Sequence, residues 1–540
     1  MEVDDPKKLA AVSAPYWMYL NKILIDGVPF DLKGRKYQYD IMTPFTPEGE
    51  FKHNEVIRKG SQTGATIGKV GEVTHGAIHG KYPQGIIFYF PSSKAVEMFS
   101  ASRFKPFIED NKVSIGKYVG QDRIDYRKIG NTKVYFFGAT ATSRVKEKKD
   151  AMAVRSTPAD WILLDERDLF DETMATQVDQ RLGNSKIWRR TDMGTPTIPD
   201  FGVDLIYKLS NQGRWQIPCN SCRKYTCLET EFPQCISLTL ESEGVLVCVH
   251  CGKRINPDDG SWQADYPKRD TIGYWTSQLL NPNCKLRLIL KRYEDPEAHG
   301  TTAGEFQRIT LGQAHIDADD ELQESDVFAC CGRDPMAISS TIPCAMGVDI
   351  GKKWLYAVIG YRLDRNRYRI IKIAKVPDFD ALHDLAVRFN VKSSVLDAQP
   401  EFHKCREWQK AEKHAVYLCY TPDNQKQDIV WTPDNQIKVL RNYLFDATHA
   451  MIRDEGVTTI PRICEEVKLF ANHLTKTVRV QEIDKRTDSP VFRYRRRGDK
   501  EDHYRCGMNY FYLACKKVGI APSPYSKRKQ EEVQDLSYAF

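Results

Sequence analysis

A glycine-bearing loop and a strand that ends in two carboxylates constrain the fold of this chain more than any other feature. Residues 59–66 read Lys-Gly-Ser-Gln-Thr-Gly-Ala-Thr, and residues 161–166 read Trp-Ile-Leu-Leu-Asp-Glu. The first stretch is typical of a loop that cradles phosphates with backbone N–H groups and a lysine. The second is typical of a buried strand whose carboxylates hold a metal ion and polarise a water. Together they predict a nucleotide-hydrolysing domain.

The loop departs from the usual phosphate-binding pattern, because Ala65 stands where the lysine before the hydroxyl residue belongs. We therefore assign the cation to Lys59, at the front of the loop, and the Mg²⁺-binding hydroxyl to Thr66. Asp165 is assigned to the Mg²⁺ shell and Glu166 to the base that orients the attacking water. The simpler alternatives are a Gly/Ser/Thr turn and an acidic helix cap. The predicted ATP-binding residues are Gln38, Lys59, Gly60, Ser61, Gln62, Thr63, Gly64, Ala65 and Thr66.

Three weaker features accompany this site. Residues 194–197 read Gly-Thr-Pro-Thr, so Thr195 and Thr197 are candidates for a γ-phosphate sensor that couples hydrolysis to movement; the alternative is a proline turn. Gln38 is a candidate for binding the adenine edge. Arg155 lies ten residues before Asp165 and is a candidate arginine finger, although a surface charge explains it equally well.

Size and composition set broad limits. A chain of 540 residues is expected to form two to four domains. Its 79 Lys and Arg against 72 Asp and Glu give a net charge of +7, which is weak evidence for nucleic-acid binding. No run of 18 apolar residues predicts a membrane span, and the N-terminus lacks an apolar signal core. We expect a cytosolic protein, in which 15 cysteines do not imply disulfides.

Four of the cysteines have the spacing of a metal site. Cys219 and Cys222 form one Cys-x2-Cys pair, and Cys248 and Cys251 form another. Four thiolates suit a tetrahedral Zn²⁺ with no open position, so the predicted zinc is structural. The residues that could replace one of these ligands are Cys227, Cys235 and His250.

Three acids from distant parts of the sequence predict a second catalytic site. Asp349 lies within an apolar strand, Asp397 ends another strand, and Asp502 opens a helix. Such acids can converge around two Mg²⁺ or Mn²⁺ ions that clamp the attacking and leaving oxygens of a phosphodiester. Glu401 and His503 are further candidate ligands, and Glu401 competes with Asp397 for the second acidic position.

A basic run precedes the third acid and favours a nucleic-acid substrate. Its cations interleave with an aromatic residue, as phosphate-backbone binding requires, and the alternative is a solvated hairpin tip. The predicted DNA-binding residues are Arg493, Arg495, Arg496 and Arg497.

The pattern of elements predicts an α/β chain. Apolar runs at 85–90, 133–137 and 161–164 alternate with helical patterns, which favours a parallel sheet covered by helices. The predicted divisions are a P-loop ATPase domain at 1–212, a zinc-ribbon-like insert at 213–268, a helical connector at 269–340, a second α/β domain at 341–522 and a mobile tail at 523–540.

These motifs resemble the large terminase subunit of tailed double-stranded-DNA phages, most closely its lambda-like branch. That family also carries its phosphate-loop lysine at the front, where Lys59 stands. The Asp-Glu pair, the Gly-Thr-Pro-Thr stretch and the cysteine-rich insert fall in the family's order. The resemblance implies a RecA-like (ASCE) P-loop ATPase, followed by an RNase H-like nuclease with Asp349, Asp397 and Asp502 as its acids.

The resemblance also implies a division of labour and a set of partners. The ATPase is expected to move double-stranded DNA into a procapsid, and the nuclease to cut concatemeric DNA. The expected partners are a small terminase subunit, the portal protein and further copies in a homo-oligomeric ring, in the cytoplasm of the infected host rather than the mature virion.

Two other classes of protein remain alternatives. A helicase-nuclease of repair or transposition would share the phosphate loop, but it is expected to show a second RecA-like lobe with an arginine motif of its own. A non-enzymatic DNA-binding zinc protein would need neither the Asp165–Glu166 pair nor the three spaced acids.

Overall fold

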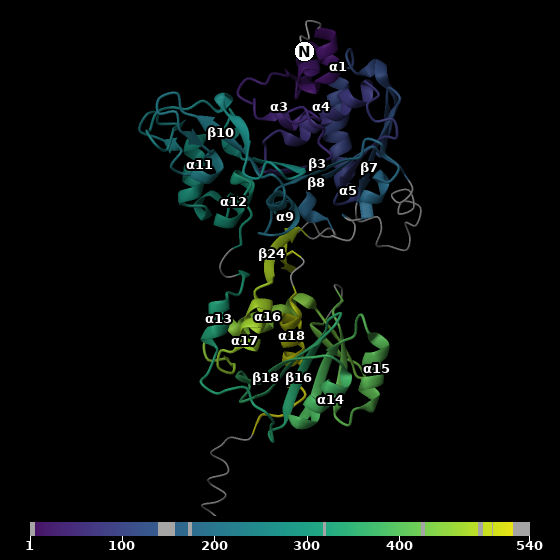
Figure 1. Cartoon of the computed structure of the whole chain (residues 1–540), viewed down its shortest axis with the longest axis vertical. Coiled ribbons are helices and arrows are strands. Elements are labelled where there is room, and N and C mark those ends of the chain that lie inside the picture. Colours follow the sequence, from purple (N-terminus) through teal and green to yellow (C-terminus); the bar gives the residue numbers. More distant parts are fainter. Residues whose placement is uncertain are drawn as a thin grey trace, which may run out of the picture. The chain divides into compact units, whose positions relative to one another are not determined.

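The computed structural model describes residues 6–138, 157–170, 175, 177–316, 320–422, 427–483, 490–498 and 501–521. The chain divides into two compact units, residues 1–316 and residues 317–540, which are purple to teal and green to yellow in Figure 1. Each unit is an α/β structure built on its own large sheet. The predicted tail at 523–540 and Arg155 lie outside the described residues.

The first unit is built on a sheet whose central strands are parallel. Six of its neighbouring strand pairs are parallel, and antiparallel strands extend both edges. In spatial order the strands are β11 (Tyr225–Thr226), β10 (Gly213–Pro218), β15 (Thr271–Thr276), β3 (Asn54–Lys59), β9 (Arg189–Gly194), β8 (Trp161–Asp165), β4 (Ile86–Phe90), β7 (Thr132–Gly138), β6 (Tyr126–Ile129) and β5 (Val119–Asp122), with β14 (Ser261–Ala264) beside β10.

Both faces of this sheet are buried, which explains the unbroken apolar runs of its sequence. In β4, Ile86, Phe88 and Phe90 enter one hydrophobic cluster, whereas Ile87 and Tyr89 enter another. Alternate residues of a strand point to opposite faces, so a strand covered on both sides must be apolar throughout.

The α-helices described in this unit are α1 (Pro6–Val12), α2 (Ala14–Leu20), α3 (Gln38–Ile41), α4 (Ala65–Ile78), α5 (Ser93–Phe99), α6 (Lys105–Asp110), α9 (Gly202–Leu209), α10 (Leu228–Glu231), α11 (Leu286–Glu294) and α12 (Ala303–Leu311).

A network of fully buried charges ties α4 to the sheet. Lys69 of α4 donates to Glu55 of β3 at 2.6 Å and to Glu72 at 2.8 Å, and Arg189 of β9 contacts Glu72 at 2.6 Å. Lys52 contacts the other oxygen of Glu55 at 3.2 Å. Burial lowers the pKa of Lys52 to about 8. The surrounding cations outweigh burial at Glu55 and lower its pKa to about 2. Every charge therefore has an opposite partner, without which burial would be prohibitive.

The prediction of a helical connector at 269–340 is wrong for residues 271–276 and for residues 320–340. Residues 271–276 form β15, which pairs in parallel with β3 at the centre of the sheet. Residues 320–340 belong to the second unit, where Leu322 and Val327 are buried. The sequence Thr-Ile-Gly-Tyr-Trp-Thr at 271–276 carries the β-branched and aromatic residues of a strand, so the signal was present.

The second unit has a mixed sheet. Three neighbouring strands are antiparallel, and three further strands extend them on one side in parallel. One edge strand is antiparallel to its neighbour, and the edge strand at the other end is parallel to its neighbour. In spatial order the strands are β21 (Ile429–Trp431), β22 (Gln436–Val439), β20 (Ala415–Tyr420), β19 (Val391–Asp397), β16 (Cys344–Ile350), β17 (Leu355–Arg362), β18 (Tyr368–Val376) and β23 (Thr458–Thr459); β24 (Thr477–Ile483) and β25 (Pro490–Arg496) form a separate hairpin. The helices are α13 (Glu324–Ala329), α14 (Phe379–Arg388), α15 (Phe402–Ala411), α16 (Arg441–Arg453), α17 (Glu465–Leu474) and α18 (His503–Cys515).

Helix α18 lies directly against β16. A Cβ on Gly347 would stand 1.9 Å from the backbone nitrogen of Phe511 and 2.3 Å from the carbonyl oxygen of Gly507. The glycine therefore lets helix and strand approach at backbone distance, and this approach positions the start of α18 beside the end of β16 (Figure 1).

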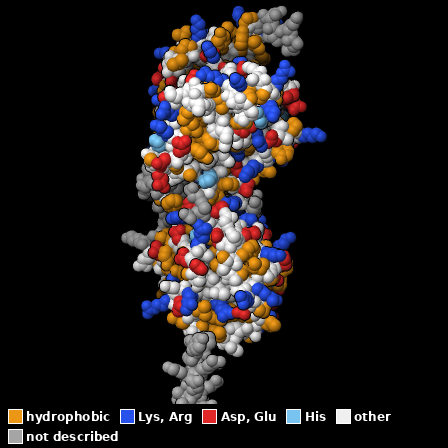
Figure 2. Space-filling model, turned by 90° about the vertical axis from the view of Figure 1, so that its left-hand side faces the viewer, with side chains coloured by type: hydrophobic (Ala, Val, Ile, Leu, Met, Phe, Trp, Pro, Cys, Tyr) orange, Lys and Arg blue, Asp and Glu red, His pale blue; other side chains and the backbone are white. Residues whose placement is uncertain are grey.

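The described residues include no helix long and apolar enough to cross a membrane. On the face drawn in Figure 2, basic and acidic side chains are interspersed over each unit rather than gathered by sign. This distribution agrees with the small net charge of the sequence.

We predict that Gly347→Ala strongly destabilises the second unit. The added methyl group overlaps the backbone of α18, and overpacking of this kind costs roughly 1–3 kcal/mol or more. Thermal unfolding followed by circular dichroism measures the effect. Gly519→Ala is the matched control, because a Cβ there meets nothing within 4 Å. Equal stability of the two variants would contradict the close packing.

Candidate functional site

The predicted phosphate loop joins β3 to α4 at the carboxyl end of a central parallel strand. Gln62 and Gly64 adopt positive φ angles of 58° and 82°, so the backbone curls between the two elements. A Cβ on Gly64 would lie 2.4 Å from Nε2 of Gln38, which shows how closely the preceding segment covers the loop. The N-terminus of a helix preceded by such a turn is a favourable place for phosphate.

Residues that follow the cysteine-rich insert hold the front of the phosphate loop. The N–H groups of Gly60 and Ser61 donate to the carbonyl oxygens of Thr276 and Ile309, each at 2.8 Å. Nε2 of Gln278 donates to the hydroxyl of Ser61 at 2.6 Å. The loop conformation therefore depends on residues far along the sequence, which its own motif does not reveal.

Residues before β3 hold the back of the loop. Nε2 of Gln38 and the hydroxyl of Tyr37 both donate to the carbonyl oxygen of Thr63, at 2.6 and 2.8 Å. Gln38 thus lies against the loop, as the predicted site requires, but its amide is bonded to backbone here. The buried hydroxyl of Thr63 has no hydrogen-bond partner within the described part of the chain. Buried polar groups normally have a partner, which can be protein, ordered water or a bound ligand.

The carboxylate pair meets the loop, as the sequence predicts. Lys59 Nζ lies 3.0 Å from Glu166 Oε1 and 3.6 Å from Asp165 Oδ1, and Thr66 Oγ1 donates to Asp165 Oδ2 at 3.1 Å. Burial alone would lower the pKa of Lys59, but the carboxylates of Glu166 and Asp165 outweigh it and raise this pKa. Burial raises the pKa of Asp165. This arrangement of lysine, hydroxyl and two acids fits Mg²⁺ and a nucleotide phosphate.

Thr197 is held by an acid that the sequence analysis missed. Asp168 Oδ2 accepts from the N–H and the hydroxyl of Thr197, at 2.7 and 2.8 Å, and Asp168 Oδ1 accepts from the N–H of Val203 at 2.7 Å. Burial raises the pKa of Asp168 to about 6. The Asp165–Glu166 turn is thereby linked to the segment that follows β9. Thr195 follows the end of β9, half-buried.

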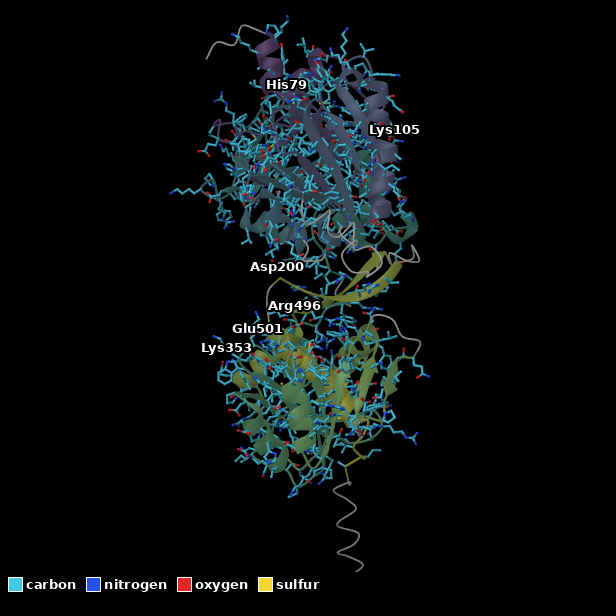
Figure 3. All side chains as sticks on the ribbon, turned by 90° about the vertical axis from the view of Figure 1, so that its right-hand side faces the viewer. His79, Lys105, Asp200, Lys353, Arg496 and Glu501 are labelled. Atoms are coloured by element: carbon cyan, nitrogen blue, oxygen red, sulfur yellow. The ribbon has the colours of Figure 1, made fainter. Side chains whose placement is uncertain are left out.

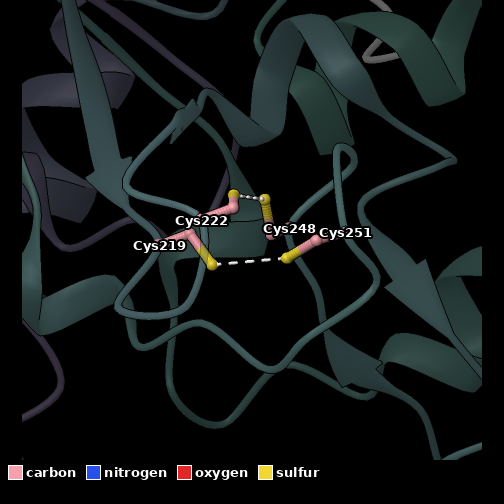
Figure 4. A group of neighbouring side chains, drawn as sticks. All are labelled: Cys219, Cys222, Cys248 and Cys251. Carbon is pink, nitrogen blue, oxygen red and sulfur yellow. Dashed lines mark hydrogen bonds between the residues drawn. The ribbon is translucent and has the colours of Figure 1, made fainter.

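Four cysteine sulfurs converge in the insert (Figure 4). All lie within 4.8 Å of one another, with 3.6 Å between Cys219 and Cys251 and between Cys222 and Cys248. A tetrahedral zinc with bonds near 2.3 Å needs sulfurs about 3.8 Å apart, so the group fits. Backbone N–H groups of Cys222 and Ser221 lower the pKa of Cys219 to about 7.

The spare ligands of the sequence analysis are not part of this group. The buried thiol of Cys227 donates to Glu229 at 3.5 Å, and that of Cys235 donates to the carbonyl oxygen of Leu228 at 3.7 Å. Burial raises the pKa of both thiols. His250 is likewise outside the group of ligand atoms.

The three predicted nuclease acids lie at one edge of the second sheet. Asp349 and Asp397 are near the carboxyl ends of the neighbouring parallel strands β16 and β19, and Asp502 is the N-cap residue of α18. Asp349 Oδ2 contacts His503 Nδ1 at 2.6 Å, and Asp397 Oδ2 accepts from the hydroxyl of Tyr510 at 2.9 Å. Residues of α18 therefore hold both strand acids.

The electrostatics of this edge favour a cation. Burial raises the pKa of Asp349 to about 6; the hydrogen bond from His503 opposes this, while the carboxylates of Asp397 and Asp502 add to it. Burial also raises the pKa of Asp397. Among the described residues these oxygens do not gather as tightly as the cysteine sulfurs. Their mutual repulsion is the kind that divalent ions relieve.

Glu401 is less well placed than Asp397. It is the exposed N-cap residue of α15 and pairs with Lys404 at 3.2 Å. The predicted basic run falls mostly on β25, whose last residue, Arg496, lies 3.6 Å from Asp502. Arg497, just after the strand, pairs with Glu321. Arg495 and Arg496 are exposed, and Arg493 and Arg497 are half-buried. The basic run thus lies beside the third acid.

Comparison with known proteins identifies part of this architecture. The family model of the ATPase domain of phage terminase large subunit gpA matches residues 33–268. No curated protein sequence matches the chain. The crystal structure of the bacteriophage HK97 large terminase aligns over 94% of this chain and 99% of that chain, with 10% identity and a TM-score of 0.51.

Two further structures give weaker likenesses. The large terminase of a thermophilic bacteriophage aligns over 88% of this chain and 97% of that chain, with 11% identity and a TM-score of 0.35. The large terminase nuclease of thermophilic phage G20c covers 35% of this chain and 96% of that chain, with 14% identity and a TM-score of 0.24.

These findings support a large-terminase ATPase domain over residues 33–268 and a fold shared with the HK97 protein. The predicted α/β ATPase domain is confirmed at this level. The lambda-like branch, the nuclease and the zinc site stay predictions.

We predict that Thr197→Val destabilises the first unit by roughly 1–3 kcal/mol, because a buried carboxylate loses a hydroxyl donor. Thr197→Ser keeps the hydroxyl and recovers most of the loss. The penalty is full well above pH 6, where Asp168 is ionised, and shrinks as the carboxyl takes up a proton at lower pH. Denaturant unfolding at pH 5 and pH 8 measures both effects. A valine variant as stable as wild type at pH 8 would show that Asp168 does not depend on Thr197.

Proposed function

We propose that this chain is the large terminase subunit of a tailed double-stranded-DNA phage, of the lambda-like branch. It would act as an ATP-driven motor that moves viral DNA into a procapsid and as an endonuclease that cuts concatemeric DNA. One observation carries the proposal: Lys59, Thr66, Asp165 and Glu166 meet in a single cluster, within residues that match a terminase ATPase domain.

In the proposed ATPase site each residue has a distinct role. Lys59 neutralises the β- and γ-phosphates, and the loop N–H groups from Gln62 onward bind their oxygens. Thr66 and Asp165 would hold Mg²⁺, which supplies further positive charge to the phosphates when bound. Glu166 orients the attacking water and accepts its proton. Its side chain is 42% exposed, so water reaches it.

The ion pair between Lys59 and Glu166 would keep the proposed base engaged until a nucleotide binds. In this structure the lysine contacts Glu166 at 3.0 Å and so engages the proposed base. A phosphate that draws Lys59 away releases Glu166 to bind water. Asp168, two residues after Glu166, would pass a shift of this turn to Thr197, which supports a coupling role for the 194–197 segment.

The second unit would be an RNase H-like nuclease. Asp349, Asp397 and Asp502 would hold Mg²⁺ or Mn²⁺, which supplies the charge that stabilises the phosphodiester in the transition state. The hydrogen bonds from Tyr510 and His503 fix the orientation of the strand acids. The basic residues of β25 would bind the DNA backbone beside them.

The remaining assignments follow from the proposed family. Cys219, Cys222, Cys248 and Cys251 would hold a structural Zn²⁺ in a ribbon-like insert. The expected partners are double-stranded DNA, a small terminase subunit, the portal protein and other copies in a ring. The expected compartment is the cytoplasm of the infected cell.

We predict that the two activities separate by mutation. Glu166→Ala abolishes ATP hydrolysis but leaves ATP binding largely intact, because the base is lost while Lys59 and the loop remain. Asp349→Ala abolishes plasmid cleavage with Mg²⁺ or Mn²⁺ but leaves ATPase activity, because the two clusters lie in different units. Phosphate release and gel-based cleavage assays measure the two activities.

The crossed design supplies its own controls, since each variant is the control for the other activity. Loss of both activities in one folded variant would contradict the two-site proposal. ATP hydrolysis without cleavage by wild type would favour the helicase-like alternative. Absence of Mg²⁺-dependent ATPase activity would favour the DNA-binding zinc protein.

We predict that Cys248→Ser lowers bound zinc from about one ion per chain to a small fraction and destabilises the insert. Metal analysis of purified protein and thermal unfolding measure the two effects. Cys284→Ser is the control, because Cys284 lies outside the four-sulfur group. A wild-type protein without zinc would end the assignment.

A further inference from the structure

A row of side chains crosses three strands of the second unit and begins at a proposed nuclease acid. Asp349 of β16 is the cross-strand partner of Tyr356 of β17, which is the partner of Lys375 of β18. Paired residues point to the same face of a sheet. Tyr356 also stacks on His503, with ring centroids 4.4 Å apart, and His503 contacts Asp349.

Trp354 continues this row to the surface. It stands two residues before Tyr356, and Lys375 Nζ lies 4.8 Å from its ring centroid and 5.7 Å from that of Tyr356. Tyr356 is 2% exposed, whereas Trp354 is 39% exposed. The indole is therefore the outer end of a series of contacts that leads inward to the carboxylate.

The turn before Trp354 is basic and lies against the same site. The N–H of Gly351 donates to the carbonyl oxygen of Trp354 at 3.0 Å, and a Cβ on Gly351 would lie 3.2 Å from the ring of His503. Lys352, Lys353 and Lys375 are exposed. Neither Lys352 nor Lys353 forms an ion pair within the described part of the chain. In Figure 3, Lys353, Glu501 and Arg496 lie at the same end of the second unit.

We propose that Trp354, with Lys352, Lys353 and Lys375, binds an unpaired nucleotide of the DNA strand that the nuclease cuts. This inference rests on the proposed nuclease function and names how its substrate is bound. The lysines would contact phosphates, and the indole would stack on a base, which an exposed aromatic ring between cations does in single-strand sites. Stacking requires a base that has left its helix, so the nuclease would act on locally opened DNA.

Two substrates separate base stacking from backbone binding. Both are oligonucleotide duplexes with a short central bubble; in one the bubble carries bases, and in the other it is abasic. Cleavage gives KM and kcat, and fluorescence anisotropy with Ca²⁺ in place of Mg²⁺ gives Kd. Full-length wild type is compared with Trp354→Ala, Trp354→Phe and Lys375→Gln.

Trp354→Ala should raise KM and Kd about tenfold on the normal bubble with little change in kcat, and Trp354→Phe should recover most of the loss. On the abasic bubble, wild type and Trp354→Ala should bind equally. Lys375→Gln should weaken binding to both substrates and reduce its salt dependence. The controls are Val387→Ala, exposed on α14, and Lys392→Gln, exposed at the amino end of β19 away from Asp397.

Trp354→Ala with an unchanged Kd on the normal bubble would overturn the inference, and so would an equal loss on both bubbles. These outcomes differ from failure of the nuclease proposal. A wild type that binds DNA but never cuts it contradicts the nuclease, while the base-dependent Kd still decides the role of Trp354.

Discussion

The buried ion network of the first unit is the constraint on which the geometry of its candidate site depends. The network joins Lys69 and Glu72 of α4 to Glu55 of β3 and Arg189 of β9, and so fixes the helix against two neighbouring strands. Removal of one partner leaves an uncompensated buried charge, which typically costs about 3–5 kcal/mol. Hydrophobic packing tolerates sliding of a helix, but paired charges set its position along the strand. The two ends of the loop between β3 and α4 are therefore fixed in position.

Both candidate sites have the same arrangement of strand acids and a neighbouring helix. Acids at the carboxyl ends of parallel strands meet a helix whose first turn lies beside them: Asp165 meets Thr66 of α4, and Asp349 meets His503 of α18. In each case a glycine allows a close approach, of the Gln38 side chain at Gly64 and of the α18 backbone at Gly347. Burial raises the pKa of Asp165 and Asp349, and a bound cation would favour their ionised form, in agreement with the proposed metal sites.

The motifs predicted the site residues better than the connections between them. The loop contacts the Asp-Glu pair, and the four cysteines contact one another, as their sequences predict. Each of these motifs is short, and its chemistry limits which residues can stand in it. The Thr276 and Ile309 carbonyls were missed, since backbone acceptors carry no sequence signature. Asp168 was missed because its partners Thr197 and Val203 lie about thirty residues further along the chain. Strand β15 was missed because a helical, polar pattern was extended over a six-residue strand that follows the insert. Its position at the sheet centre is set by tertiary pairing.

The anchoring of the phosphate loop by Thr276 and Ile309 has a consequence for how the molecule is made. A nascent chain that has emerged only as far as the end of the insert still lacks both carbonyl acceptors and the strand that pairs with β3. The loop N–H groups would then face water, and one edge of β3 would be open. The proposed nucleotide site is thus completed late in translation of the first unit, and a fragment that stops at residue 268 lacks these contacts.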